Sequence, residues 1–328
     1  MPLSRVIVGA LSRRMDAGVR WQIRAVQGEV WSVRHGWYVS ALGEEGRKDG
    51  DRFIELSDGA RLWATISGQG PPVVLCHGGP GLWDYLGPLA ALLDGKFTVI
   101  RFDQRGCGRS SGTGPFTIAQ AVDDLEQIRA SLGYDRWSVL GHSWGAELVL
   151  RYAAAQPDHT ASVIYLAGVG AGDGFRDEFS VAFRARLGHQ LDRWLELREK
   201  ARTPEEEHEF CLLQWSPDYS PGPATHAHAE ALWETRPPGT HTNLAANREL
   251  GAERLTDDLL RTASRVTSPV TMILGADDPR PWHASTSLFG ALSDVRRHVI
   301  EGAGHSPWSE QPDQTERLIT EGLLPNTH

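Results

Sequence analysis

The stretch Gly141-His142-Ser143-Trp144-Gly145 decides the fold of this chain. It lies between a short apolar run at 137–140, which is typical of a buried strand, and residues 146–155, which are typical of a helix. A serine flanked in this way at a strand-to-helix turn is the pattern of a nucleophile elbow, a tight and strained turn that holds the hydroxyl above the sheet. The stretch therefore predicts that Ser143 is a nucleophile and that the positive end of the following helix points at the site.

Short apolar segments alternate with helical segments from Asp51 onwards. The runs at 53–56 and 62–66, joined by the turn Ser57-Asp58-Gly59-Ala60, predict a hairpin. The expected strands are 53–56, 62–66, 73–76, 98–102, 137–140, 162–166, 270–274 and 298–300. The expected helices are 85–93, 118–132, 146–155, 282–292 and 314–323. This alternation predicts an α/β fold with a mostly parallel central sheet and helices on both of its faces.

The alternation stops between residues 172 and 267, where the chain is richly charged and helix-like. A helical insertion between two core strands predicts a lid over the site. We therefore expect a core formed by 51–171 and 268–328, with a lid formed by 172–267. Residues 1–50 are basic and show no clear period, so they are treated as an N-terminal extension. A flexible arm, a docking arm and a translation start at Met15 are the interpretations left open for it.

Composition excludes several classes of function. The chain has 328 residues, of which 40% are hydrophobic and 23% charged, as in a globular protein. A net charge of −9 without a basic stripe argues against nucleic acid as a partner. Three cysteines are too few for a disulfide framework, and no metal-binding spacing occurs. The apolar run at 6–11 is too short for a signal sequence or a membrane span. We expect a cytoplasmic protein with no metal, cofactor or membrane partner, whose oligomeric state the sequence leaves open.

A serine nucleophile needs a histidine base, and the histidine needs a carboxylate that orients it. His305 lies in a glycine-containing loop, 302–306, directly after the last expected strand, where it could reach the elbow. The acid is expected after the strand at 270–274, where Asp277 and Asp278 are both candidates. The spacing from Gly275 favours Asp278, because related enzymes carry the acid in a G-x-x-D arrangement.

Acyl transfer also needs hydrogen-bond donors for the developing oxyanion. The backbone N–H of Trp144 directly follows the nucleophile and is the first candidate. The second is the N–H of Gly79, in the loop His77-Gly78-Gly79-Pro80-Gly81 that follows the strand at 73–76. Glycines let backbone amides approach a ligand closely. The loop lacks the G-x-G-x-x-G pattern of a dinucleotide site.

Three motifs together resemble the proline iminopeptidase family of α/β-hydrolases. They are the glycine-rich loop at 77–81, the run Asp103-Gln104-Arg105-Gly106-Cys107-Gly108-Arg109-Ser110, and the elbow at 141–145. The likeness covers roughly residues 51–170 and returns at 270–310. It implies that the middle run is a structural loop at the rim of the active site, in which Arg105 braces neighbouring loops.

The resemblance also implies an activity and a place to look for specificity. Family members remove an N-terminal proline, and glutamates of their lid hold the free amine of the substrate. Glu234, preceded by Trp233, lies about where the family has a Trp-Glu pair, so it is the leading amine anchor, with Glu249 as a second. Trp144 and Trp233 are expected walls for an apolar ring.

These observations favour a serine hydrolase that is proline iminopeptidase-like and cleaves an N-terminal proline or a related small amide through an acyl-enzyme. Its partner would be a small molecule or a short peptide. The chain departs from the family at His142, since family members usually have glycine there and many esterases and lactonases carry Gly-His-Ser. An esterase, lactonase or amidase of a small-molecule pathway is therefore the alternative. A catalytically silent binding module is a third, which the complete set of catalytic motifs disfavours.

Overall fold

The computed structural model describes residues 22–26, 29–34, 37–40 and 50–324, which fall into two units that divide at residue 47. The first unit holds a three-stranded antiparallel sheet in the order β1-β2-β3, made of β1 (Gln22–Val26), β2 (Glu29–Arg34) and β3 (Trp37–Ser40). The sequence prediction found no elements there. The signal that could have found them is a series of short runs rich in β-branched and aromatic residues, separated in the sequence by Gln27-Gly28 and His35-Gly36.

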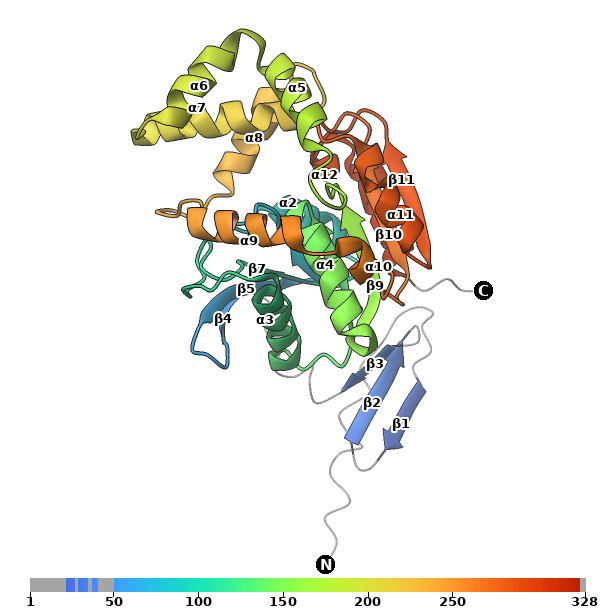
Figure 1. Ribbon diagram of the computed structural model, residues 1–328. Coiled ribbons are helices and arrows are strands. Elements are labelled where there is room, and N and C mark those ends of the chain that lie inside the picture. Colours follow the sequence, from blue (N-terminus) through green and yellow to red (C-terminus); the bar gives the residue numbers. More distant parts are fainter. Residues whose placement is uncertain (1–21, 27–28, 35–36, 41–49, 325–328) are drawn as a thin grey trace, which may run out of the picture. The chain divides into compact units, whose positions relative to one another are not determined.

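The second unit is built on an eight-stranded sheet in the order β11-β10-β9-β8-β6-β7-β5-β4 (Figure 1). The strands from β11 to β7 pair in parallel, and the hairpin of β4 and β5 joins β7 in antiparallel fashion. The strands are β4 (Gly50–Glu55), β5 (Arg61–Ser67), β6 (Pro72–Cys76), β7 (Thr98–Phe102), β8 (Trp137–His142), β9 (Thr160–Leu166), β10 (Val270–Gly275) and β11 (Val295–Ile300).

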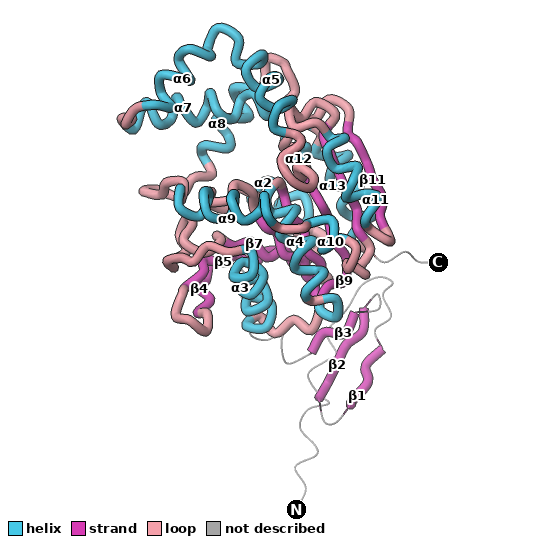
Figure 2. Tube along the Cα trace, viewed as in Figure 1, coloured by secondary structure: helices cyan, strands magenta, loops and turns pink. Residues whose placement is uncertain are grey.

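Helices cover both faces of this sheet (Figure 2). On one face, α3 (Ile118–Ser131), α4 (Trp144–Ala155), α10 (Leu259–Ala263) and α11 (Thr286–Ala291) share a hydrophobic core. On the other face lie α2 (Gly87–Leu93), α12 (Pro307–Glu310) and α13 (Pro312–Leu323). Within the described part of the chain, we find no helix with the length and apolarity needed to cross a membrane.

The central strands are buried on both faces because successive side chains of a strand point to opposite sides of the sheet. In β6, Val74 and Cys76 belong to one core, whereas Val73 and Leu75 belong to the other. All five residues of this strand are buried, which explains why the sequence reads as a continuous apolar run. The predicted α/β fold, with its mostly parallel sheet and two helical layers, is confirmed.

The expected helices are all present, and most of their boundaries differ by one or two residues from the prediction. The helix expected from residue 85 begins at Gly87, since Pro88 fits only the first turn of a helix. The helix expected over 282–292 is divided into a short 3₁₀ turn, Trp282–Ser285, and α11.

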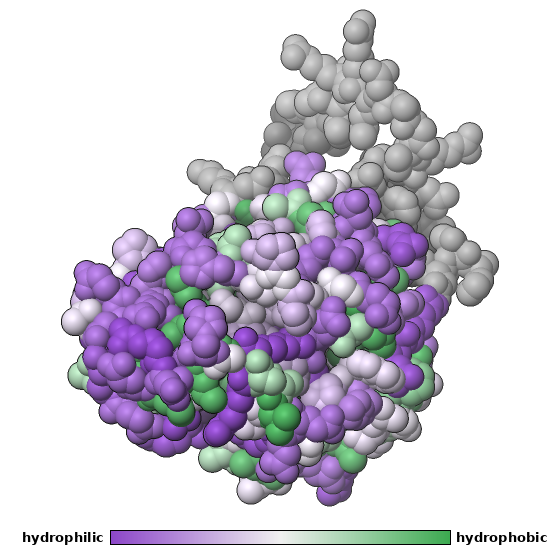
Figure 3. All heavy atoms as spheres, turned by 90° about the horizontal axis from the view of Figure 1, so that it is seen from above, coloured by the Kyte–Doolittle hydropathy of each residue, from purple (hydrophilic) through white to green (hydrophobic). Residues whose placement is uncertain are grey.

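Six helices lie between β9 and β10. They are α5 (Arg176–Leu187), α6 (Leu191–Glu199), α7 (Pro204–Trp215), α8 (Thr225–Glu234), α9 (Leu244–Thr256) and α10. Phe183, Leu187, Trp194, Leu197 and Leu213 form a small hydrophobic core between α5, α6 and α7, apart from the two cores of the sheet. The face of the molecule seen in Figure 3 is mainly hydrophilic, in keeping with the many charges of these helices.

A buried ion-pair cluster fastens this helical segment to the sheet layer. Glu147 of α4 is fully buried and accepts a 2.6 Å hydrogen bond from Nε of Arg254 on α9. Its other carboxylate oxygen lies 3.4 Å from Arg151, which also binds Asp257 at 2.8 Å. Burial raises the pKa of the Glu147 carboxyl, and the two arginines oppose that shift. Each charge of the cluster is thus held in place by its partners.

We expect Glu147→Ala to lower the free energy of unfolding by about 3–5 kcal/mol, because it leaves the Arg254 guanidinium buried without a carboxylate. Urea unfolding followed by circular dichroism would measure the change. The matched control is Glu199→Ala, which removes a carboxylate that is 70% exposed and pairs with Arg198, so it should change stability little. Equal stability of the two variants would contradict a fastening role for Glu147.

Candidate active site

The nucleophile elbow is shaped by close backbone contacts. Ser143 joins β8 to α4 with φ 58° and ψ −119°, a strained conformation for a residue other than glycine. A Cβ atom on Gly141 would lie 1.9 Å from the carbonyl oxygen of Gly145, and one on Gly145 would lie 2.1 Å from that of Cys76. Only glycine therefore allows the strand, the turn and the helix to pass this closely, as the sequence pattern predicts.

His305 and Asp278 are brought together at the ends of two neighbouring strands. Nδ1 of His305 lies 2.6 Å from Oδ2 of Asp278, and both side chains are less than a tenth exposed. Asp277, the alternative acid, faces away and accepts a 2.9 Å hydrogen bond from the hydroxyl of Ser220. The structure thus places Asp278, the aspartate favoured by the spacing from Gly275, against the histidine.

Arg280 and Asp218 complete the charged group around this pair. Arg280 donates its backbone N–H to the Asp278 carboxylate at 2.8 Å and its guanidinium to Asp218 at 2.7 Å. The backbone oxygen of Asp218 in turn accepts the N–H of His305 at 2.7 Å. Burial and the positive charge of Arg280 lower the pKa of His305, while burial raises the pKa of Asp278 against the opposing effect of Arg280. Sequence reasoning missed both residues.

A chain of hydrogen bonds links the histidine loop to the glycine-rich loop. The Tyr85 hydroxyl accepts the N–H of Gly78 at 2.8 Å and lies 2.7 Å from Nδ1 of His142. Nε2 of His142 lies 2.7 Å from the carbonyl oxygen of His305. Because a carbonyl oxygen can only accept, Nε2 of His142 donates this hydrogen bond, and burial lowers the pKa of His142 well below its usual value. His142 is thus a positioning residue for His305, a role that the elbow motif alone does not reveal.

The two expected oxyanion donors lie at the expected turns. Gly79 has φ +125°, a region that favours glycine, and lines the cavity above Ser143. The Trp144 N–H begins α4, directly after the nucleophile. Gln104 links the glycine-rich loop to the beginning of α4. Its side-chain amide nitrogen donates to the His77 carbonyl at 2.7 Å, and its amide oxygen accepts the N–H of Trp144 Nε1 at 3.2 Å. The Trp144 indole is buried against Ile118, Ala246 and Leu250, so it is not the expected cavity wall.

The run at 103–110 is a bracing loop, as the resemblance implied. Arg105 donates to Asp124 of α3 at 2.8 Å and to Asp58 of the β4–β5 turn at 2.7 Å. Asp103 is fully buried and accepts the backbone N–H groups of Asp84 and Arg109. These contacts fix the loop that carries Gln104.

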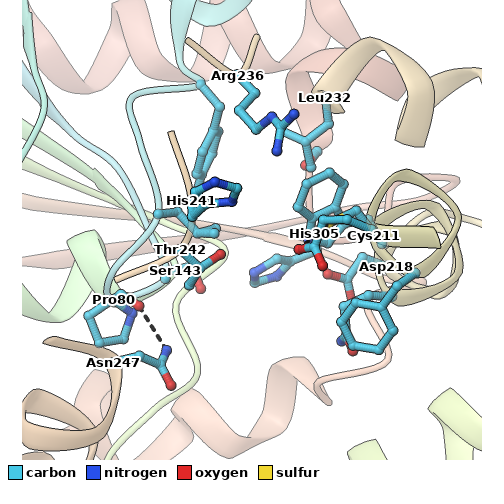
Figure 4. Close-up of a pocket in the computed structure, with 18 of the residues that line it drawn as sticks. Pro80, Ser143, Cys211, Asp218, Leu232, Arg236, His241, Thr242, Asn247 and His305 are labelled. Carbon is cyan, nitrogen blue, oxygen red and sulfur yellow. Dashed lines mark hydrogen bonds between the residues drawn. The ribbon is translucent and has the colours of Figure 1, made fainter. Parts of the chain in front are cut away.

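Ser143 and His305 line one cavity of about 800 Å³ that lies under the helical segment (Figure 4). This volume is typical of sites for small molecules. Figure 4 shows the His305 ring and the Ser143 side chain next to each other at its base, with Leu232 and Arg236 above them. Within residues 50–324, the only hydrogen bond of the His305 ring is the one to Asp278, so its other nitrogen is not bonded to Ser143. Contacts of this kind are often long or poorly aligned before a substrate binds.

The three lid residues expected to bind substrate lie outside the cavity lining. Leu232 and Arg236 line it instead, Leu232 from the last turn of α8 and Arg236 from just beyond the end of that helix. Glu234 is exposed. The Trp233 ring packs behind the wall, 6.4 Å from the ring of Trp215 and 4.8 Å from that of His208. Glu249 is exposed and accepts the N–H of Phe116 at 3.3 Å.

Other charged residues line the cavity in their place, namely Arg202, Glu207, Asp218, Arg236, His241 and Arg280. They come from α7, from loops of the insertion and from the loop after β10. No sequence motif marks them, because their common position depends on how the insertion packs. Among the described residues, we find no group of three or more His, Cys, Asp or Glu side chains arranged to hold a metal ion.

Comparison with known proteins agrees with this geometry. Residues 71–312 match the family model described as the alpha/beta hydrolase fold. RutD of Escherichia coli O6:H1, a protein named as a carbamate hydrolase on a provisional basis, is 29% identical over 79% of this chain and 90% of its own length. A proline iminopeptidase of Xylella fastidiosa is 37% identical over 33% of this chain and 36% of its own. The crystal structure of the Mycobacterium smegmatis proline iminopeptidase superposes with a TM-score of 0.63 at 25% identity, over 84% of this chain and 97% of its own. The resemblance predicted from the motifs is confirmed.

We expect Asp278→Asn to lower kcat by on the order of 10⁴, because the amide would no longer hold the His305 ring as the carboxylate does. Asp277→Asn is the matched control, since it changes the adjacent residue whose carboxylate binds Ser220. Steady-state kinetics of the two variants, at equal stability, would compare them. A larger loss of kcat in Asp277→Asn than in Asp278→Asn would mean that Asp277, and not Asp278, is the acid that orients His305.

We expect Arg280→Gln to move the acidic limb of the kcat/KM profile to higher pH by about one unit or more. In the mechanism expected from the sequence, the active form has a neutral His305 and an ionised Asp278. Removing the guanidinium charge raises the pKa of both groups, so both take up protons at a higher pH. Arg280→Lys keeps the charge and should move the limb less. An unmoved limb in the folded Arg280→Gln variant would contradict electrostatic control by Arg280.

Proposed function

The chain belongs to the α/β hydrolase fold family, and from that premise we propose that it is a serine hydrolase that works without a cofactor. One observation carries the proposal. The imidazole of His305, bonded to Asp278 at 2.6 Å, lines the same cavity as Ser143 at its strained elbow. A nucleophile, a base and an orienting acid at one cavity are the requirements for acyl transfer.

The proposed reaction has two halves. With Asp278 ionised, Nδ1–H of His305 donates to it, which leaves Nε2 free to take the proton of the Ser143 hydroxyl. The serine oxygen attacks the substrate carbonyl, and the N–H groups of Gly79 and Trp144 hold the oxyanion. His305 then gives the proton to the leaving group. A water molecule, activated by the same histidine, attacks the acyl-enzyme and releases the acid.

We propose a small-molecule ester, amide or carbamate as the substrate class. The cavity of about 800 Å³ suits such a compound. The match to RutD, which extends over most of both chains, supports a cleavable carbonyl flanked by oxygen or nitrogen.

An aminopeptidase that removes an N-terminal proline is the second candidate, favoured by the likeness to proline iminopeptidases in sequence and structure. Its substrate carries an ammonium group that needs a free carboxylate. Glu234 and Glu249, the expected anchors, lie outside the cavity lining. Rates with prolyl-p-nitroanilide and with p-nitrophenyl acetate would separate the candidates, because only an aminopeptidase should prefer the former.

We expect Ser143→Ala to abolish turnover, with a loss in kcat on the order of 10⁴ to 10⁶, while the protein stays folded. The wild type should react covalently with a fluorophosphonate probe, and mass spectrometry should locate the adduct on Ser143. The variant should show neither labelling nor turnover and should have an unchanged circular dichroism spectrum. Turnover near the wild-type rate, or labelling of a different serine, would overturn the mechanism.

A further inference from the structure

Three arginines line the active-site cavity, and two of them are already paired with carboxylates of the same cavity. Arg202 forms an ion pair with Glu207. Arg280 binds Asp218, with the atoms of the ion pair 2.7 Å apart. The third, Arg236, has no carboxylate partner within 4.0 Å among residues 50–324.

The Arg236 guanidinium is held in place without its donors being used up. It stacks on the Trp233 ring, with Cζ 3.8 Å from the ring centroid. Its only hydrogen bond within the described chain is a long one, 3.4 Å from Nη1 to the Thr240 carbonyl oxygen. A planar cation resting on an aromatic face keeps most of its N–H groups available for a ligand. Figure 4 shows this side chain in the same cavity as Ser143 and His305.

The pairing leaves Arg236 as the one arginine of the lining without a carboxylate partner among residues 50–324. Its two carboxylates, Glu207 and Asp218, are both engaged by arginines, so an incoming ammonium would have to break an existing ion pair. An incoming anion meets a cation that is still free. Because a charge that leaves water needs a partner, the cavity favours anionic ligands over cationic ones.

Much of the remaining lining is apolar. Leu82, Phe210, Trp215, Leu232 and Leu244 contribute to the same cavity. A ligand that fits this lining has an apolar chain or ring, with one charged end and a carbonyl at the other.

We propose that the substrate carries a carboxylate, bound by Arg236, at a distance from the carbonyl that Ser143 attacks. The fork of the guanidinium can bind both carboxylate oxygens at once, which fixes the far end of the substrate and so positions its reacting end. This inference rests on the proposed function, because it assigns the substrate class of the same site. It makes monoesters or monoamides of dicarboxylic acids the preferred compounds.

Matched pairs of chromogenic esters test the proposal. The p-nitrophenyl monoester of adipate is compared with p-nitrophenyl 6-methylheptanoate, in which an isopropyl group replaces the carboxylate, and longer diacids extend the series. In the wild type, kcat/KM should be at least about tenfold higher for the charged ester. Arg236→Gln should lower kcat/KM for the charged ester by about 10- to 100-fold and leave the neutral ester within about twofold.

Two further variants serve as controls. Arg236→Lys keeps the charge but loses the fork, so it should retain part of the preference. Glu234→Gln removes an exposed charge two residues away that lies outside the cavity lining, so it should change neither ester. Equal kcat/KM for both esters, or an equal loss on both in Arg236→Gln, would overturn the carboxylate subsite while the serine hydrolase stands.

Binding of adipate itself gives a readout that does not depend on turnover. Calorimetry at low ionic strength should show adipate binding to Ser143→Ala, with an affinity about tenfold lower when Arg236→Gln is added. An equal affinity for both proteins, or no binding to either, would overturn the subsite whatever the enzyme does. If adipate binds through Arg236 but no ester is cleaved and Ser143 resists the fluorophosphonate probe, the proposed function fails and the subsite stands.

Discussion

The close passage of backbone around Ser143 is the constraint on which the rest of the site depends. β8, the turn and α4 approach so nearly that a single methyl group at Gly141 or Gly145 would collide with a carbonyl oxygen. β6 lies beside β8 and supplies the carbonyl that Gly145 contacts, so the sheet itself holds the elbow. The strain at Ser143 can persist only because this buried sheet layer is rigid. The Ser143 hydroxyl is thereby fixed where two other loops can reach it.

Those loops belong to segments far apart in the chain, and polar contacts join them. Tyr85 and His142 connect the loop of the oxyanion donors to the carbonyl of His305. Asp218, which comes from the helical insertion, holds the N–H of His305 and the side chain of Arg280. The insertion therefore helps to position the His305 loop of the candidate site. A movement of the segment that carries Asp218 would be transmitted directly to the histidine.

The sequence predicted the parts of the molecule that local rules determine. Strand periodicity identified the sheet, because burial on both faces requires apolar residues along a strand. The glycine pattern identified the elbow, because crowded backbone there requires glycine. The pairing of Asp278 with His305 could be expected, because both follow the ends of neighbouring strands. Pro88, which sets the beginning of α2, was a local signal that was overlooked. The three-stranded sheet of the first unit was missed because its strand-forming runs are too short to show a clear period.

The part of the cavity lining that the insertion contributes could not be predicted in the same way. Glu234 was chosen by its distance from Ser143 along the chain, but packing decides which face of a helix meets the cavity. Here Trp233 packs against Trp215 and stacks on Arg236, and Arg236 lines the cavity, so a cation stands where an anionic anchor was expected. The core must preserve backbone contacts at the elbow, and the insertion must keep Asp218 against His305 and Arg280. A cavity-facing charge away from these contacts, such as Arg236, can be exchanged without disturbing Ser143, and its sign then decides which substrates can leave water for the site.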